Sequence, residues 1–242
     1  MTARVALVTG GSRGIGASIA ESLARDGFDI AISYARNATA AEQTVERIAA
    51  TGRTARAYRA GEGAGAAEDL IGQVARDFGR LDVLVCNAGI YPYAMVRDMT
   101  TEQVDATLGL NVRAVMLETI AAVRHMPRGG RIIFIGSTFG ERAPFPGISL
   151  YSATKAALTG FARGLARDLG PDGITVNVIQ PGPIDTDMNP ADGAAADMLR
   201  GFLCVPEYGK PGDIAAMASF LARPESDNIT GAALTVDGGL AA

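Results

Sequence analysis

The chain has 242 residues, a formal net charge of −4 at pH 7 and a hydrophobic content of 48%. This length suits one α/β domain with its own core, the hydrophobic content excludes a disordered chain, and the acidic balance argues against a nucleic-acid partner. The two cysteines, Cys86 and Cys204, lie far apart without a neighbouring ligand, which excludes a zinc knuckle or a secreted disulfide framework, and we expect no metal.

Short β-branched runs alternate with longer stretches of helical spacing, a pattern typical of βαβ units and a parallel sheet. The predicted strands are Val5–Thr9, Asp29–Tyr34, Thr54–Tyr58, Leu81–Cys86, Arg131–Gly136, Ile174–Ile179 and Ala233–Val236. The predicted helices are Ile15–Asp26, Ala38–Thr51, Ala66–Phe78, Thr101–His125, Ser149–Leu169 and Asp213–Arg223. Most of these strands are apolar throughout, as expected where helices cover both faces of a sheet. The sequence therefore predicts a single α/β domain over residues 1–242.

Two segments indicate where the protein is located in the cell and how a substrate reaches the site. The first apolar run, Val5–Val8, is too short for a signal peptide or a membrane span, so we expect a cytoplasmic protein without membrane association. The segment Asp187–Lys210 is rich in glycine and proline around a weak helical stretch. Long loops in compact domains are usually functional, so we expect a substrate lid near 187–210.

A glycine-rich turn, Thr9–Gly16, joins the first strand to the first helix, with glycines at 10, 14 and 16. Unpaired N–H groups and the positive end of a helix dipole favour anions at such a junction, and the missing Cβ atoms allow a pyrophosphate to approach. The spacing differs from GxGxxG, so that fingerprint does not apply. A tight loop without a ligand is the alternative interpretation.

Charge at the end of the second strand indicates which dinucleotide the turn would bind. An NAD site usually has an acidic residue there, whereas an NADP site needs cations for the 2′-phosphate. The strand ends Ser33-Tyr34-Ala35-Arg36-Asn37 without an acid, and Arg13 adds a second cation from the glycine turn. We predict NADP(H); two solvated surface arginines are the alternative.

Tyr151 and Lys155 lie four residues apart in a predicted helix and so share one face. An ammonium close to a phenol favours the phenolate, so we expect Lys155 to lower the pKa of Tyr151 and make it a general acid or base near neutral pH. Ser137 follows the fifth strand at the same sheet edge and can bind a carbonyl oxygen. The sole histidine, His125, is interpreted as structural, which disfavours a serine nucleophile.

Taken together, these motifs resemble those of a classical short-chain dehydrogenase/reductase over essentially the whole chain, closest in pattern to the 3-oxoacyl carrier-protein reductases. The matching residues are the turn Thr9–Gly16, Asn87-Ala88-Gly89, Asn111, Ser137, Tyr151 with Lys155, and Pro181-Gly182 followed by Ile184 and Thr186. The resemblance implies a three-layer Rossmann fold, with a doubly wound parallel sheet of about seven strands, in a homotetramer or a homodimer.

The resemblance also implies the roles of the catalytic residues. Tyr151 is the general acid or base, Lys155 lowers its pKa and holds the nicotinamide ribose, Ser137 polarises the carbonyl, and Asn111 keeps a water in a proton relay. With the charge argument above, the expected cofactor contacts are Gly10, Ser12, Arg13, Gly14, Ile15, Gly16, Tyr34, Arg36, Asn87, Ala88, Gly89, Tyr151, Lys155, Pro181, Gly182, Ile184 and Thr186.

The chain departs from the family pattern in three places. No Asp follows the third strand, where the family contacts adenine, which leaves Glu62 as a substitute. Fourteen positions separate Ser137 from Tyr151, one more than is common, which makes Thr138 a rival for the hydroxyl role; Gly140 favours Ser137.

The third departure concerns the substrate, because Asp172 stands where carrier-protein reductases often have a basic residue, although Arg128 and Arg131 are near. Like charges weaken docking of an acidic carrier. We therefore predict an NADP(H)-dependent carbonyl reductase or alcohol dehydrogenase acting on a small molecule, with a 3-oxoacyl thioester reductase and a non-catalytic dinucleotide-binding sensor as alternatives. An enzyme acting on nucleotide sugars is less favoured, because those usually need a further substrate domain.

Overall fold

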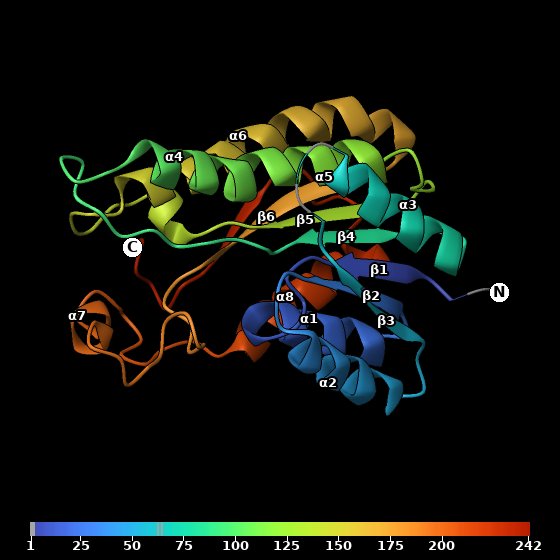
Figure 1. Cartoon of the computed structure of the whole chain (residues 1–242), viewed down its shortest axis with the longest axis horizontal. Helices are drawn as coiled ribbons and strands as arrows, with labels where there is room; N and C mark the ends of the chain where they lie inside the picture. The colour runs from blue at the N-terminus through green and yellow to red at the C-terminus, as the bar shows by residue number, and fades with distance from the viewer. Residues whose placement is uncertain (1–2, 62, 64) are drawn as a thin grey trace.

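The computed structural model describes residues 3–61, 63 and 65–242, and within them the chain forms a seven-stranded parallel sheet (Figure 1). The strands are β1 (Val5–Val8), β2 (Asp29–Tyr34), β3 (Ala55–Arg59), β4 (Val83–Cys86), β5 (Arg131–Ile135), β6 (Thr175–Pro181) and β7 (Ala233–Val236). Their order is β3-β2-β1-β4-β5-β6-β7, with every neighbouring pair parallel. The predicted doubly wound α/β sheet is confirmed, and the strand limits differ from the predicted ones by at most two residues.

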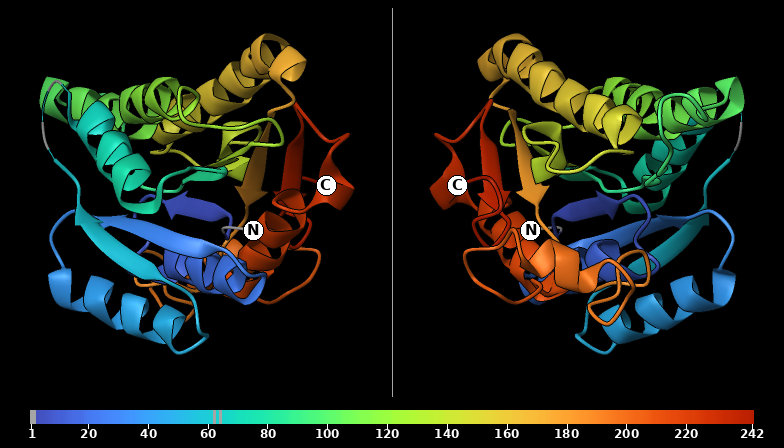
Figure 2. Two further views of the ribbon diagram at one scale, coloured as in Figure 1. Left: turned by 90° about the vertical axis from the view of Figure 1, so that its right-hand side faces the viewer. Right: turned by 90° about the vertical axis from the view of Figure 1, so that its left-hand side faces the viewer.

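Helices cover both faces of this sheet, as the apolar strands predict. The helices are α1 (Gly14–Arg25), α2 (Ala38–Ala49), α3 (Ala66–Phe78), α4 (Thr101–Leu108), α5 (Val115–Ala122), α6 (Ser149–Leu169), α7 (Ala196–Arg200) and α8 (Pro211–Leu221). Figures 1 and 2 show α1, α2 and α8 on one side of the sheet and α3, α4, α5 and α6 on the other. None of the helices in the described part of the chain has the length and apolarity needed to span a membrane.

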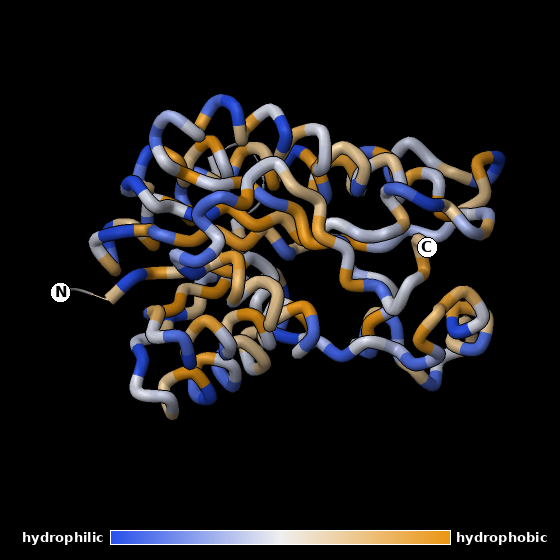
Figure 3. Tube along the Cα trace, turned by 180° about the vertical axis from the view of Figure 1, so that it is seen from behind, coloured by the Kyte–Doolittle hydropathy of each residue, from blue (hydrophilic) through white to orange (hydrophobic). Residues whose placement is uncertain are grey.

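Each face of the sheet has its own hydrophobic core because side chains alternate along a strand. In β1, Ala6 and Val8 join the core beneath α1, α2 and α8, whereas Val5 and Leu7 join the core beneath α3, α5 and α6. In Figure 3 the hydrophobic colour follows the central strands and the hydrophilic colour the outer turns. Both cores lie directly against the strands, so the sheet is a rigid base for the loops at its edges.

The order of the strands reverses between β1 and β4, which are neighbours although β2 and β3 intervene in the sequence. Open α/β sheets bind ligands in the crevice at the carboxyl ends of the strands on either side of such a reversal. The glycine-rich turn after β1 and Asn87 after β4 both lie at this point. The fold therefore directs attention to the carboxyl edge of the sheet.

The predicted single helix Thr101–His125 is wrong in its middle and at its end. The chain forms α4, then a π-helical segment Gly109–Ala114, then α5, which ends at Ala122. A π turn widens the helix by one residue and changes the hydrophobic face too little for the residue spacing to reveal it. The last predicted helix is also displaced: α8 starts at Pro211, because proline is tolerated in the first turn, and ends at Leu221.

Candidate active site

The glycine turn has the geometry that close approach of an anion requires. Gly10 and Gly14 have φ angles of 63° and 55°, in the left-handed region that favours glycine. A Cβ at Gly16 would lie 2.4 Å from the Gly10 carbonyl oxygen and 2.5 Å from Asn87 Nδ2. Arg13, the residue before α1, makes no side-chain capping bond, so the first N–H groups of α1 face outward at Gly14, Ile15 and Gly16. These features fit a dinucleotide pyrophosphate.

The end of β4 is tied to the glycine turn by hydrogen bonds. Asn87 Nδ2 donates to the carbonyl oxygens of Thr9 and Gly10, at 2.9 and 3.1 Å. The Thr9 hydroxyl in turn accepts from the backbone N–H groups of Asn87 and Ala88, at 3.1 and 3.2 Å. The family motif predicts Asn87 and Ala88, whereas the role of Thr9 has only one local signal in the sequence, a hydroxyl directly after β1.

Further predicted cofactor residues lie on the loops around this turn. A Cβ at Gly14 would lie 3.4 Å from Thr186 Cγ2, so the turn and the segment after β6 are adjacent. Gly182 packs so tightly that its Cβ would lie 2.6 Å from Asp237 Cα, and Ile184 forms a β-bridge with Gly209. Pro181 is the last residue of β6. The glycine turn at Gly14 and the Pro181–Thr186 segment at Thr186 therefore lie side by side.

The residues predicted to distinguish NADP(H) from NAD(H) lie at or near the surface. Arg13 Nη1 lies 3.0 Å from Asp187 Oδ2, with the two side chains 60% and 71% exposed. Ser12, whose carbonyl oxygen accepts from Thr44, precedes Arg13 in the turn. Tyr34 is half-buried at the end of β2, and Arg36 is exposed in the turn that follows. Glu62, the expected substitute for the adenine contact, lies outside the described residues.

Asn111 projects from the π-helical segment and holds the loop after β4. Its Oδ1 accepts from the Ile90 N–H and its Nδ2 donates to the Ile90 carbonyl oxygen, both at 2.9 Å. Nδ2 also donates to Thr154 Oγ1 at 3.2 Å. A Cβ at Gly89 would lie 3.1 Å from Asn111 Oδ1 and 3.7 Å from Lys155 Nζ, so these three predicted residues meet. π turns often occur at functional sites, and here one carries a predicted catalytic residue.

Ser137, Tyr151 and Lys155 converge from β5 and α6. Lys155 Nζ donates to the Ile135 carbonyl oxygen at 2.8 Å and lies 5.6 Å from the centre of the Tyr151 ring. Burial raises the pKa of Tyr151 to about 12, while the hydrogen bond from Ser137 lowers it. Burial lowers the pKa of Lys155 to about 8. In this structure desolvation of the phenol is the largest influence on the pKa of Tyr151, and a lowering by Lys155 stays a prediction.

The pKa of Lys155 has a measurable consequence for stability. Between about pH 8 and pH 10.5 the unfolded chain binds a proton at Lys155 that the folded protein has lost, so the free energy of unfolding rises with pH in this window. Tyr151 has the opposite effect, but only above its ordinary pKa of 10. We expect urea unfolding from pH 8 to pH 10 to show this rise in the wild-type protein, relative to Lys155→Met. A difference in the free energy of unfolding between the two proteins that stays constant from pH 8 to pH 10 would contradict this expectation.

The two candidate hydroxyls near the end of β5 point to different partners. Ser137 accepts from the Phe139 N–H at 3.1 Å, and its hydroxyl acts to lower the pKa of Tyr151. Thr138 is fully buried and donates to the Gln180 carbonyl oxygen and to Asp237 Oδ2, at 3.4 and 3.3 Å. The geometry therefore favours Ser137 as the hydroxyl available to a substrate next to Tyr151.

The segment predicted as a lid, near 187–210, contains the short helix α7. Ala196, Leu199 and Tyr208 form a small cluster that packs against Phe139 and Phe145, which follow Ser137 in the chain. Figure 1 shows α7 at the end of the molecule opposite the N-terminus. Its contacts attach the segment to the loop that carries Ser137, beside the carboxyl edge of the sheet.

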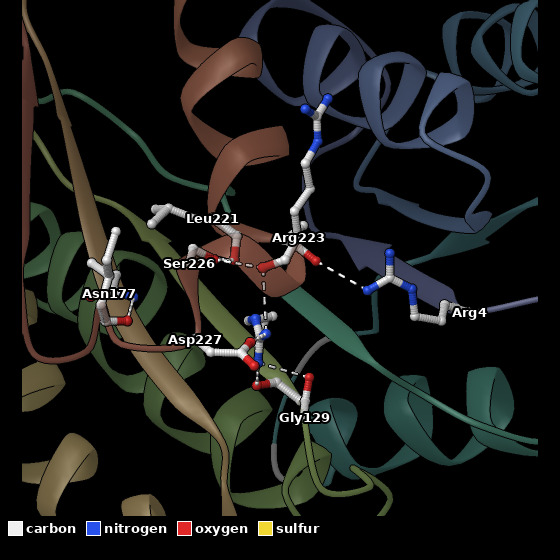
Figure 4. Close-up of polar contacts among 11 residues, drawn as sticks. Arg4, Gly129, Asn177, Leu221, Arg223, Ser226 and Asp227 are labelled. Carbon is white, nitrogen blue, oxygen red and sulfur yellow. Dashed lines mark hydrogen bonds and ion pairs between the residues drawn. The ribbon is translucent and has the colours of Figure 1, made fainter.

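Arg131 does not take the position that carrier docking would need. It is 4% exposed at the start of β5, at the opposite edge of the sheet from Ser137. Its guanidinium donates to the Gly129 and Gly130 carbonyl oxygens, at 2.9 and 3.1 Å, and pairs with Asp227. Two of these partners, Gly129 and Asp227, are labelled in Figure 4. Arg128 lies on the same side and donates to the Pro171 carbonyl oxygen. Arg128 therefore lies next to Asp172, as expected, and both arginines lie at the other end of β5 from Ser137.

The chain is similar to known proteins over almost its whole length. Residues 10–241 match the family model described as enoyl-(acyl carrier protein) reductase. The chain is 42% identical over 241 residues to the cyclic-di-GMP-binding biofilm dispersal mediator protein of Escherichia coli, covering 100% of this chain and 98% of the other. It is 40% identical over 244 residues to a 3-oxoacyl-[acyl-carrier-protein] reductase of Synechocystis, with 99% and 98% covered.

A solved structure is also similar to this chain, in both fold and sequence. The crystal structure of a short-chain dehydrogenase from Burkholderia cenocepacia in complex with NADP superimposes with a TM-score of 0.97 at 51% identity, covering 99% of this chain and 98% of the other. The similarity spans all seven strands and the loops at their carboxyl ends.

Proposed function

Because this chain belongs to the short-chain dehydrogenase/reductase family, we propose that it uses NADP(H) to interconvert a ketone and a secondary alcohol, with Tyr151 as the general acid and base. It is an oxidoreductase by this membership. One observation carries the proposal for the reaction: Lys155 Nζ lies 5.6 Å from the centre of the Tyr151 ring and donates to the carbonyl oxygen of Ile135, two residues before Ser137, at the sheet edge that holds the glycine turn. A carbonyl oxygen placed between the Ser137 and Tyr151 hydroxyls would accept from both.

The chain's own residues supply binding, orientation and the proton. The glycine turn and the first N–H groups of α1 bind the pyrophosphate, and Lys155 and the Asn87–Gly89 segment lie where the nicotinamide ribose would be held. The bound cofactor supplies the hydride that adds to the carbonyl carbon. Tyr151, protonated at neutral pH because its pKa is about 12, donates its proton to the carbonyl oxygen. Ser137 donates a hydrogen bond to the same oxygen and stabilises the charge that develops there.

Similarity to an NADP complex supports the choice of cofactor, and so do the cations near the predicted 2′-phosphate position. We expect the double variant Arg13→Ala, Arg36→Ala to raise the Kd for NADPH about tenfold and to leave the Kd for NADH nearly unchanged, since only NADPH carries the phosphate. Titration of cofactor fluorescence measures both constants.

Asp187 provides a matched control for this prediction, because its carboxylate pairs with Arg13 at 3.0 Å. Asp187→Asn frees Arg13 and is expected to lower the Kd for NADPH while the Kd for NADH stays unchanged. Equal weakening of both cofactors in the arginine variant would contradict the assignment of these arginines to the 2′-phosphate.

The substrate is best sought with a panel of ketones, diketones, quinones and 3-oxoacyl thioesters, measured as oxidation of NADPH. The Synechocystis relative favours including the thioesters. Exposed Asp172 and the buried position of Arg131 argue against docking of an acidic carrier on that side. We therefore place a small free ketone first and a carrier-bound thioester second.

The relative from Escherichia coli favours a second candidate function, a non-catalytic dinucleotide-binding sensor. The presence of Asn111, Ser137, Tyr151 and Lys155 together supports catalysis instead, because a sensor has no use for a paired phenol and ammonium in a buried site. Absence of turnover across the panel, together with tight binding of a cyclic dinucleotide, would favour the sensor.

The proposal also covers the domain organisation, the lid, the cellular location and the assembly of the protein. We propose that residues 1–242 act as one domain, that the segment 187–210 closes over the substrate, and that the protein is cytoplasmic and assembles as a homotetramer or a homodimer. Light scattering of the purified protein distinguishes these two assemblies.

A further inference from the structure

Tyr91 lies on the loop after β4, and its ring forms a T-shaped pair with the ring of Tyr151. The ring centroids are 4.8 Å apart and the planes are inclined by 75°. This edge-to-face arrangement is one that aromatic pairs prefer, because the positive edge of one ring faces the negative face of the other. Burial raises the pKa of the Tyr91 phenol, so this ring is neutral at physiological pH. No step of the proposed reaction uses Tyr91.

The backbone on both sides of Tyr91 is held in place. On one side, the Asn111 side chain bonds both the N–H and the carbonyl oxygen of Ile90. On the other, the Ala94 N–H donates to the Gly147 carbonyl oxygen at 3.0 Å, which ties the loop to the segment before α6. A short loop fixed at two points has little freedom to move its aromatic side chain away from α6.

The same hydrogen bonds connect this loop to the backbone of Tyr151. Asn111 Nδ2 donates to Thr154 Oγ1 at 3.2 Å, and Thr154 Oγ1 donates to the Tyr151 carbonyl oxygen at 2.7 Å. The loop and the first turn of α6 are therefore linked twice, once through Asn111 and Thr154 and once through the two aromatic rings. Both links bear on where the Tyr151 phenol lies.

We propose that Tyr91 is a positioning residue, whose ring holds the Tyr151 phenol against Ser137 and in line with the carbonyl oxygen of the substrate. The inference rests on the proposed function, since Tyr151 is the group that it positions. Small displacements of a proton donor slow a reaction strongly, because the transfer requires hydrogen-bond distance and alignment. The ring of Tyr91, and not its hydroxyl, carries this role.

The kinetic experiment compares three variants of the full chain, with phenanthrenequinone and diacetyl as test ketones and NADPH at saturation. Tyr91→Leu removes the ring and is expected to lower kcat about three- to tenfold with little change in KM. Tyr91→Phe keeps the ring and is expected to retain kcat. Tyr93→Leu is the matched control: its ring lies against Gly147 and is 62% exposed, and kcat is expected to stay the same.

A second measurement does not depend on turnover. The chain has six tyrosines, so fluorotyrosine labelling gives a simple ¹⁹F NMR spectrum in which Tyr151→Phe identifies the Tyr151 signal. Tyr91→Leu is expected to move that signal, because it removes a neighbouring aromatic ring. Tyr91→Phe and Tyr93→Leu are expected to leave it close to its wild-type position.

The outcomes separate this inference from the proposed function. An unmoved Tyr151 signal in Tyr91→Leu, or equal effects of Tyr91→Leu and Tyr93→Leu on kcat, would overturn the role of Tyr91 while leaving the reaction standing. Full turnover by Tyr151→Phe would overturn the proposed function itself. A moved signal with a lower kcat in Tyr91→Leu, restored in Tyr91→Phe, supports both.

Discussion

Replacing Tyr151 by Phe is expected to lower kcat for ketone reduction by at least about a hundredfold, since general acid catalysis by a positioned side chain contributes at least that much. The variant keeps the ring, so the contact with Tyr91 and the packing of α6 are preserved. It loses only the hydroxyl that would donate the proton. Turnover is measured as NADPH oxidation with whichever ketone of the panel the wild-type protein reduces fastest.

The control for this prediction is cofactor binding. Tyr151→Phe should bind NADPH with a Kd close to the wild-type value, because the pyrophosphate is assigned to the glycine turn and the ribose to Lys155. Thr138→Ala, at a hydroxyl directed to Gln180 and Asp237, should leave the acid step intact. Unchanged kcat in Tyr151→Phe would refute the mechanism, and an essential Thr138 with a dispensable Ser137 would reverse the assignment of the second hydroxyl.

Replacing Gly16 by Ala is expected to have the next largest effect. The new Cβ would lie 2.4 Å from the Gly10 carbonyl oxygen and 2.5 Å from Asn87 Nδ2, and a backbone atom cannot move aside as a flexible side chain can. We expect the free energy of unfolding to fall by about 1–3 kcal/mol, as is typical of overpacking. The displaced turn should also bind NADPH at least about tenfold more weakly.

Gly160→Ala is the matched control for this substitution, because the Cβ would meet no atom within 4 Å in the middle of α6. Alanine is the better helix former, so this variant should be as stable as the wild-type protein or slightly more stable. Urea unfolding and NADPH titration measure both variants. Normal stability and cofactor affinity in Gly16→Ala would contradict the close packing of the turn.

Local sequence signals were sufficient for the fold and for most of the candidate site. The positions of most strands follow from largely apolar runs, because a strand covered on both faces has few polar positions. The glycine turn could be identified because left-handed backbone and close approach both require glycine. The i, i+4 spacing of Tyr151 and Lys155 ensured that any helix would place them on one face.

Long-range packing decided what those signals could not. The π-helical segment around Asn111 was missed because its widened turn leaves almost no trace in residue spacing, while its effect is a contact with Ile90 from a distant loop. That Arg131 has its guanidinium enclosed by Gly129, Gly130 and Asp227 also depends on packing that sequence distance does not reveal. The contact of Tyr91 with Tyr151 joins residues sixty positions apart.

The residue types and their spacing by themselves determined a doubly wound α/β fold with a dinucleotide-type turn and a Tyr–Lys pair. Only the tertiary structure decided the pKa values of these two residues. Burial raises the pKa of Tyr151 to about 12 and lowers that of Lys155 to about 8. The spacing of the two residues alone predicted a lowered pKa for the Tyr151 phenol. The physical reason is that desolvation depends on every group packed around an atom, and those groups come from β4, β5 and α6 together.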